Sequence, residues 1–134
     1  MDTRALTAQM TAAFRYAARI YLCTLVPCFD REAPQIVQLL EKLTACLEGI
    51  PAGAHGFDRS LVWVLLIGGS VAGPRRRFRT MLADRAGALG EDSAFGSFGR
   101  MVQLLQEVWS RRDAGHEVEW RDVMQSQGWE YLLV

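Results

Sequence analysis

Apolar side chains recur along most of this chain at steps of three or four residues. That spacing places them on one face of an α-helix, whereas strict alternation would indicate a strand. Proline and glycine interrupt the pattern at intervals, as at helix ends. The helices that it predicts cover about Thr3–Val26, Pro34–Glu48, Ala94–Arg112 and Glu119–Gln127.

The segment Ser60–Ala72 differs, because its sequence SLVWVLLIGGSVA is apolar on every side. A segment of this kind is buried in the centre of a fold. Its β-branched residues are compatible with either a helix or a strand. We favour a helix, because the neighbouring segments are helical and Asp58 or Ser60 can cap its start. A further helix is predicted to begin at Pro74 and to run through RRRFRTMLADRA.

Together these elements predict an all-α fold, in which about six helices form a compact bundle around the central apolar helix. The 134 residues fit a single domain, 1–134, and a chain of this length buries about two-thirds of its unfolded surface. The apolar faces are large for six short helices. We therefore expect a homodimer or larger oligomer, in which a second copy covers part of them.

The charged residues balance, with 15 basic and 15 acidic side chains. A net charge of zero argues against a nucleic-acid-binding module, which needs surplus cations. All the basic residues except Lys42 are arginines, which suit interfaces and ion pairs. The start of the chain has no apolar run of signal-peptide length, and no stretch is long enough to span a membrane. We expect an intracellular protein with no membrane partner.

Three cysteines, Cys23, Cys28 and Cys46, form no CxxC pair and have no histidine near them in the sequence. This spacing does not suit a zinc site, so we predict no metal and interpret them as buried free thiols in a reducing compartment.

The candidates for catalysis are few. His55 lies in the glycine-rich segment PAGAHGFD, three residues before Asp58, and such a loop could position a general base. The alternative is an exposed loop histidine with no role. Arg75–Arg77 and Arg79 could hold an anion at a helix start, but we favour a solvated face that pairs with Glu91, Asp92 or a partner.

Large aromatic side chains are numerous, and most of them must belong to the core. They could also line an apolar pocket for a hydrophobic or aromatic small molecule. No phosphate-binding glycine motif is present, so we predict no cofactor. The predicted pocket wall consists of Tyr21, Trp63, Phe98, Met101 and Trp109.

Several segments resemble the closing section of the fungal-specific transcription factor domain. These are LVWVLLIGGSVA, RRRFRTML, VQLLQEVWSRRD and VEWRDVMQSQGWEYLLV, and ARIYLCTLVP resembles the helix that precedes them. The resemblance implies an all-α fold, a fungal source and a regulatory region downstream of a zinc binuclear cluster. Its six cysteines are absent here, and Val64 and Val71 stand where the family usually has proline and an acidic residue.

Two hypotheses follow. In the first, the chain is a stand-alone derivative of the regulatory domain that binds a metabolite. It could then be a cofactor-independent enzyme for an intramolecular cyclisation or addition in secondary metabolism, with His55 and Asp58 moving the proton. A methionine just before the first helix and a natural-looking end at Val134 motivate it. In the second, the chain is a non-DNA-binding regulatory or dimerisation domain of a nuclear zinc-cluster transcription factor. The sequence does not decide whether the protein is an enzyme.

Overall fold

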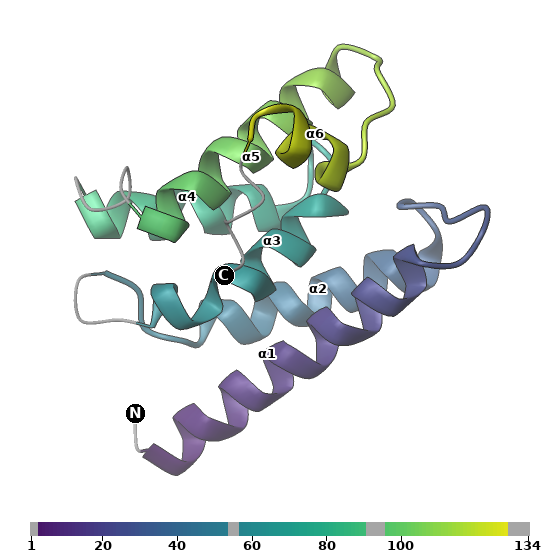
Figure 1. Cartoon of the computed structure of the whole chain (residues 1–134). Helices are drawn as coiled ribbons and strands as arrows, with labels where there is room; N and C mark the ends of the chain where they lie inside the picture. Colours follow the sequence, from purple (N-terminus) through teal and green to yellow (C-terminus); the bar gives the residue numbers. More distant parts are fainter. Residues whose placement is uncertain (1–2, 54–56, 91–95, 129–134) are drawn as a thin grey trace.

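The computed structural model describes residues 3–53, 57–90 and 96–128, and within them it contains helices and no strand (Figure 1). This confirms the all-α prediction. The helix Pro34–Glu48 has the bounds that the sequence predicts. The elements in chain order are α1 (Thr3–Thr24), α2 (Pro34–Glu48), the 3-10 turn η1 (Asp58–Leu61), α3 (Val62–Ser70), α4 (Arg77–Leu89), α5 (Gly96–Asp113) and α6 (Trp120–Ser126).

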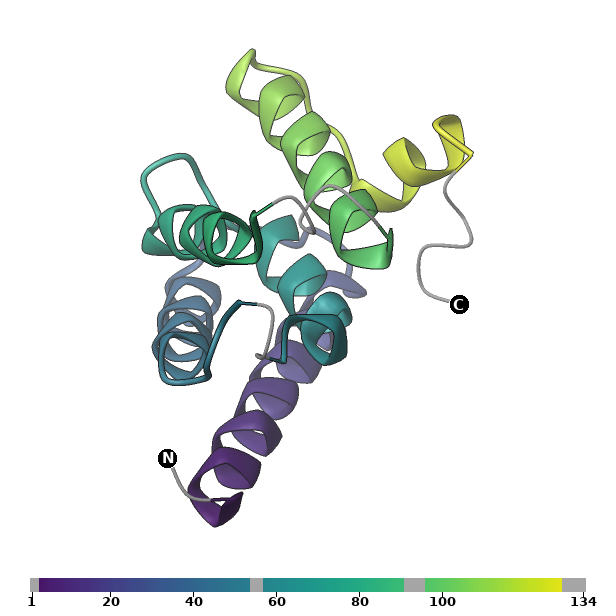
Figure 2. The ribbon, with the colours of Figure 1, turned by 90° about the vertical axis from the view of Figure 1, so that its left-hand side faces the viewer.

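Helix α3 lies at the centre of the fold, as its uniformly apolar sequence predicts. Every residue of α3 except Trp63 is buried. The helix contacts α1, α2, α4 and α5, and Figure 2 shows these helices placed around it. The core contains the inward residues of all of them. The packing of a short apolar helix inside a shell of amphipathic helices is the basis of the fold.

Two glycines allow this close packing. A Cβ atom on Gly68 would collide with the ring of Phe78 on α4, and one on Gly69 would collide with Leu105 on α5. The absence of both side chains therefore lets α4 and α5 approach the backbone of α3.

Carbonyl groups at and just beyond the end of α3 accept hydrogen bonds from side chains of α4 and α5. The indole of Trp109 donates to the Gly69 carbonyl at 2.9 Å, and Arg112 Nη1 donates to the Ser70 carbonyl. Arg79 donates to the Ala72 carbonyl through Nε and Nη2, and its guanidinium lies 4.5 Å from the Trp109 ring centre. These contacts fix the buried end of the central helix.

A buried ion pair joins α4 to η1, the turn that precedes α3. Arg85 Nε donates to Asp58 Oδ1 at 2.6 Å, and the two side chains are 4% and 1% exposed. The other nitrogens of Arg85 donate to backbone carbonyls at and just beyond the end of α2, namely those of Leu47, Ile50 and Pro51. Arg85 therefore completes the carbonyl end of α2 and joins it to η1 and α4.

The structure corrects three local predictions. Helix α4 begins at Arg77, and Pro74 lies in a turn that the Arg76 N–H closes onto the Gly73 carbonyl. Neither η1 nor α3 has a side-chain cap, because the Asp58 carboxylate accepts from Arg85 and the Gly53 N–H instead. None of the three cysteines is fully buried as predicted, since Cys23 and Cys46 are partly exposed and Cys28 is exposed, with a φ of 62°.

Three arginines of the run at the start of α4 form ion pairs within the described residues. Arg76 pairs with Glu32, Arg77 with Glu48 and Arg79 with Asp113. The predicted partners, Glu91 and Asp92, lie outside the described residues.

Helix α1 lies at the edge of the bundle, and its first turns extend beyond the other helices (Figure 2). It packs on α2 and α3 through Ala13, Ala17 and Ile20. No helix in the described ranges is long and apolar enough to cross a membrane. The opposite side of α1 is left without a covering element in the described part of the chain.

Candidate functional site

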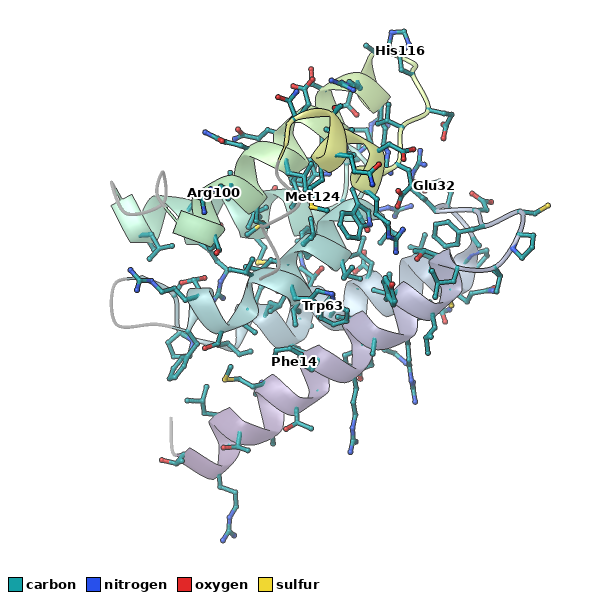
Figure 3. All side chains as sticks on the ribbon, in the orientation of Figure 1. Phe14, Glu32, Trp63, Arg100, His116 and Met124 are labelled. Carbon is teal, nitrogen blue, oxygen red and sulfur yellow. The ribbon has the colours of Figure 1, made fainter. Side chains whose placement is uncertain are left out.

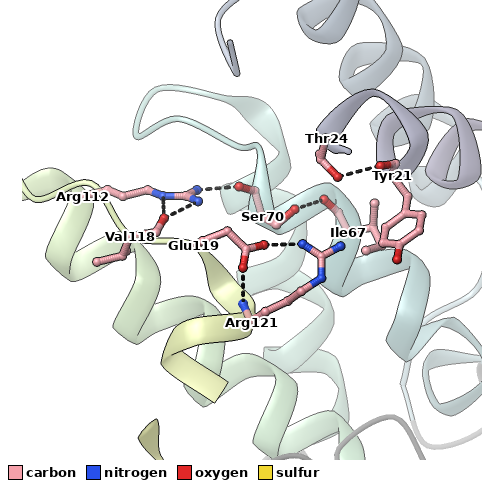
Figure 4. Close-up of polar contacts among 8 residues, drawn as sticks. All are labelled: Tyr21, Thr24, Ile67, Ser70, Arg112, Val118, Glu119 and Arg121. Atoms are coloured by element: carbon pink, nitrogen blue, oxygen red, sulfur yellow. Dashed lines mark hydrogen bonds and ion pairs between the residues drawn. The ribbon is translucent and has the colours of Figure 1, made fainter. Parts of the chain in front are cut away.

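A cleft of about 590 Å³ lies where the end of α1, the end of α3 and the connection between α5 and α6 meet (Figure 4). This volume is in the range of small-molecule sites. The cleft is lined by Thr24, Phe29, Arg31, Ser70, Val71, Arg111, Arg112, Glu117, Val118, Glu119, Trp120, Arg121, Asp122, Val123 and Ser126.

Arg112 forms one wall of the cleft and is held by backbone carbonyls. Its Nη1 donates to Ser70, and its Nε and Nη2 donate to Val118 at 3.1 and 2.9 Å. Burial, with a smaller contribution from the neighbouring charge of Arg31, lowers the pKa of Arg112 to about 10. The group therefore stays cationic at neutral pH, and its charge is balanced by carbonyl dipoles rather than by an ion pair in the described part of the structure.

Arg121 lies between two aromatic rings. Its guanidinium carbon is 4.6 Å from the Trp120 ring centre and 5.2 Å from that of Tyr21. Nη1 pairs with Glu119, while Nη2 is buried and has no hydrogen-bond partner. The electrostatic attraction between the Arg121 guanidinium and the two ring faces compensates for that missing hydrogen bond.

Two acids of the cleft are paired with arginines. Arg31 Nη1 lies 3.2 Å from Glu117 Oε2, and this hydrogen bond and charge lower the pKa of the Glu117 carboxyl. Glu119 accepts from the backbone N–H of Arg121 and caps α6. The cleft therefore combines two ion pairs, Arg31 with Glu117 and Arg121 with Glu119, with an arginine that is held by backbone carbonyls.

The structure brings together two of the five residues of the predicted pocket wall. The rings of Tyr21 and Trp63 meet edge to face with centroids 6.0 Å apart. Phe14 stacks on Trp63 with centroids 6.4 Å apart, between α1 and α3 (Figure 3). These rings connect the surface of α1 to the cleft through Arg121, which lies over Tyr21.

The other three residues of the predicted wall lie elsewhere. Phe98 and Met101 are 4% and 0% exposed and belong to the core. Trp109 binds the Gly69 carbonyl and is covered by Arg79. The five side chains therefore do not surround one cavity, and their role in ligand binding stays a prediction.

Only one residue of the predicted catalytic pair lies within the described residues. His55 lies outside the described residues, and Asp58 is buried in its ion pair with Arg85. A proton-transfer role for either residue stays a prediction. The second histidine, His116, is exposed and lies in the connection between α5 and α6 (Figure 3). The described residues contain no group of three His, Cys, Asp or Glu side chains that could hold a metal ion.

Comparison with known proteins decides the family. The profile described as "Fungal specific transcription factor domain" matches residues 2–134. The chain belongs to the fungal-specific transcription factor domain family. It is also similar to the Neurospora crassa protein named "Transcriptional regulatory protein pro1", with 44% identity over 160 aligned residues. The alignment covers the whole of this chain, and it covers 23% of the Neurospora protein. No solved structure matches the chain.

Two of the segments that carry the family resemblance supply contacts around the end of α3. EVWSRRD supplies Trp109, Arg112 and Asp113, and RRRFRTML supplies Arg79. All four take part in the contacts around the end of α3. Sequence reasoning missed Arg112 and Arg121 as cleft residues, because their partners are carbonyls and rings that a residue pattern does not reveal. The available signal was the excess of arginine over lysine.

Proposed function

We propose that this chain is a regulatory domain of a fungal transcription regulator, which acts through contacts with other proteins and does not itself read DNA. The observation that carries the proposal is the match of the family profile to residues 2–134, with 44% identity to a regulatory protein over the whole chain. The chain spans 23% of that relative, so DNA recognition is assigned to another part of such a regulator. A nuclear location follows from the proposal.

Two physical features support it. The net charge of zero gives no electrostatic basis for binding the phosphate backbone, and the strongest arginine run is already paired with acids. Several large apolar side chains are also exposed near the end of α1, with Leu22, Leu25 and Val26 between 55% and 62% exposed. Exposed apolar residues in a group are typical of protein contact surfaces.

The comparisons favour this interpretation over the metabolite-binding or enzyme hypothesis, for which they give no support. The five predicted wall residues give that hypothesis no support, because Phe98 and Met101 belong to the core and the other three are partly buried side chains packed against it. The predicted self-association through apolar helix faces is retained as part of the proposal, with the end of α1 as its surface.

The test is a tethered reporter assay. The chain is fused to a DNA-binding domain from another source, and transcription of a reporter that carries the matching sites is measured in a filamentous fungus. We expect transcription to differ from that given by the DNA-binding domain alone. A fusion with the core substitution Gly69→Leu, expressed to the same level, should lose the effect. Equal transcription with and without the chain would contradict the proposal.

A further inference from the structure

One side of α1 is exposed along its whole length. Six residues at steps of three or four form this outer face, on the opposite side of the helix from buried Ala13 and Ala17. The outer face consists of Arg4, Ala8, Thr11, Arg15, Arg19 and Leu22.

The charge on the outer face is not neutralised within the described structure. Helix α1 contains Arg4, Arg15 and Arg19 and no aspartate or glutamate. None of these three takes part in the ion pairs of the described residues, although seven other arginines do. In a chain with no net charge, α1 is therefore a locally cationic helix.

The surface of α1 also has a shape that a second helix can fit. Two shallow depressions of about 520 and 390 Å³ lie on either side of the ridge formed by Thr11 and Arg15. Small residues such as Ala8 and Ala18 line them, which lets another backbone approach closely. The first depression also contains Phe14, which is 40% exposed.

Phe14 is suited to anchor a partner because it is already held in place. Its ring stacks on Trp63 with an interplanar angle of 10°. Binding to a side chain that is fixed in advance loses less conformational entropy than binding to a mobile one. Aromatic and arginine side chains are also the residues that contribute most to protein interfaces.

We propose that the outer face of α1 docks an acidic amphipathic helix of a partner protein. An apolar side chain of that helix contacts Phe14 in the first depression, and carboxylates pair with Arg15 and Arg19, which are one turn apart. A third carboxylate reaches Arg4, about 16 Å along the axis from Arg15. Arginine favours such contacts because its planar group binds a carboxylate through two parallel hydrogen bonds.

The composition of the face favours this partner over a lipid bilayer or a nucleic acid. A helix that lies on a membrane inserts a broad face of large apolar residues, whereas alanine and threonine separate the arginines here. Three cations on a 22-residue helix are few for binding a phosphate backbone. The inference rests on the proposed function for its biological setting, since acidic amphipathic segments are typical of transcriptional activation regions.

The test uses the purified full chain and a synthetic, fluorescently labelled helical peptide with leucine on one face and glutamate along both edges. Fluorescence anisotropy should show saturable binding, which weakens as the salt concentration rises. A peptide with lysine in place of glutamate should not bind. The double variant Arg15→Glu, Arg19→Glu should weaken binding at least about tenfold. The matched variant Arg75→Glu, which changes an exposed arginine outside α1, should bind like the wild type.

The same anisotropy assay is run with duplex DNA and with vesicles that contain phosphatidylserine. The proposal is overturned if the acidic peptide does not bind, if the double variant binds it like the wild type, or if DNA or vesicles bind through these arginines and the peptide does not. Self-association that disappears in the double variant, without peptide binding, would also overturn it. None of these outcomes depends on transcription, so they are distinct from a failure of the reporter assay.

Discussion

Replacing Asp58 by alanine removes the carboxylate that lies 2.6 Å from Arg85 Nε inside the fold. The guanidinium stays buried, with backbone carbonyls as its remaining partners. Breaking a buried ion pair by removing one partner destabilises a protein by about 3–5 kcal/mol. Because a small domain has about 5–15 kcal/mol of stability in total, we expect a large loss. At about 3 °C for each kcal/mol, the melting temperature should fall by about 10 °C or more.

Urea unfolding followed by circular dichroism measures this change. The midpoint should fall while the denaturant slope stays constant, which shows that stability changed and the extent of unfolding did not. The isosteric variant Asp58→Asn keeps a weaker acceptor for Arg85 and should lie between wild type and alanine. It also keeps the test possible if the alanine variant does not fold.

The matched control is Asp84→Ala, which removes an exposed acid from the helix that carries Arg85. A surface change of this kind should alter stability by about 0.5 kcal/mol or less. If Asp58→Ala is as stable as this control, the ion pair does not contribute to the fold as described. Such a result would also make a chemical role for Asp58 the better explanation of its position.

Three further predictions concern the core, the thiols and acid stability. Gly69→Ala should lower the free energy of unfolding by about 1–3 kcal/mol, because the added methyl group overlaps Leu105 on α5. Gly87→Ala, where the space is open, should raise it by about 0.5–1 kcal/mol. Urea unfolding midpoints measure both changes. Cys28 is exposed and should react with iodoacetamide before Cys46, whose thiol pKa is raised by burial; mass spectrometry gives the order. The hydrogen bond from its arginine partner lowers the Asp113 carboxyl pKa below 3.8. The ion pair of Asp113 with Arg79 therefore stabilises the fold above pH 3.8. This contribution is lost as the pH falls through the lower pKa that Asp113 has in the folded state. Asp113→Asn should accordingly reduce the loss of stability from about pH 5 to about pH 2, measured by urea unfolding.

The sequence predicted the parts of the fold that depend on local pattern. The bounds of α2 agree, since proline at its start and glycine after its end are local signals. The central position of α3 also agrees, because a helix without a polar side has to be enclosed on all sides. The start of α4 was misplaced at Pro74, because the residues after it form a turn before the helix.

The site depends on contacts between residues far apart in the sequence, and these have no local pattern. Arg85 and Asp58 are 27 positions apart, and Arg112 binds a carbonyl 42 positions away. A candidate pair of Asp58 and His55 was chosen because the two are close in sequence, whereas the ion pair of Asp58 is formed by tertiary packing. The excess of arginine was the correct signal, but it could not show which arginines are paired and which are free.

Domain replacement in Neurospora crassa tests whether this chain acts as a regulatory domain. The region of the "Transcriptional regulatory protein pro1" that matches this chain is replaced by this chain, and transcript abundance is compared with the wild type and with a strain in which that region is deleted. A regulatory domain of this family should restore the transcripts that the deletion changes. A replacement strain with the same transcripts as the deletion strain, while the chimeric protein is present at normal abundance, would contradict the account.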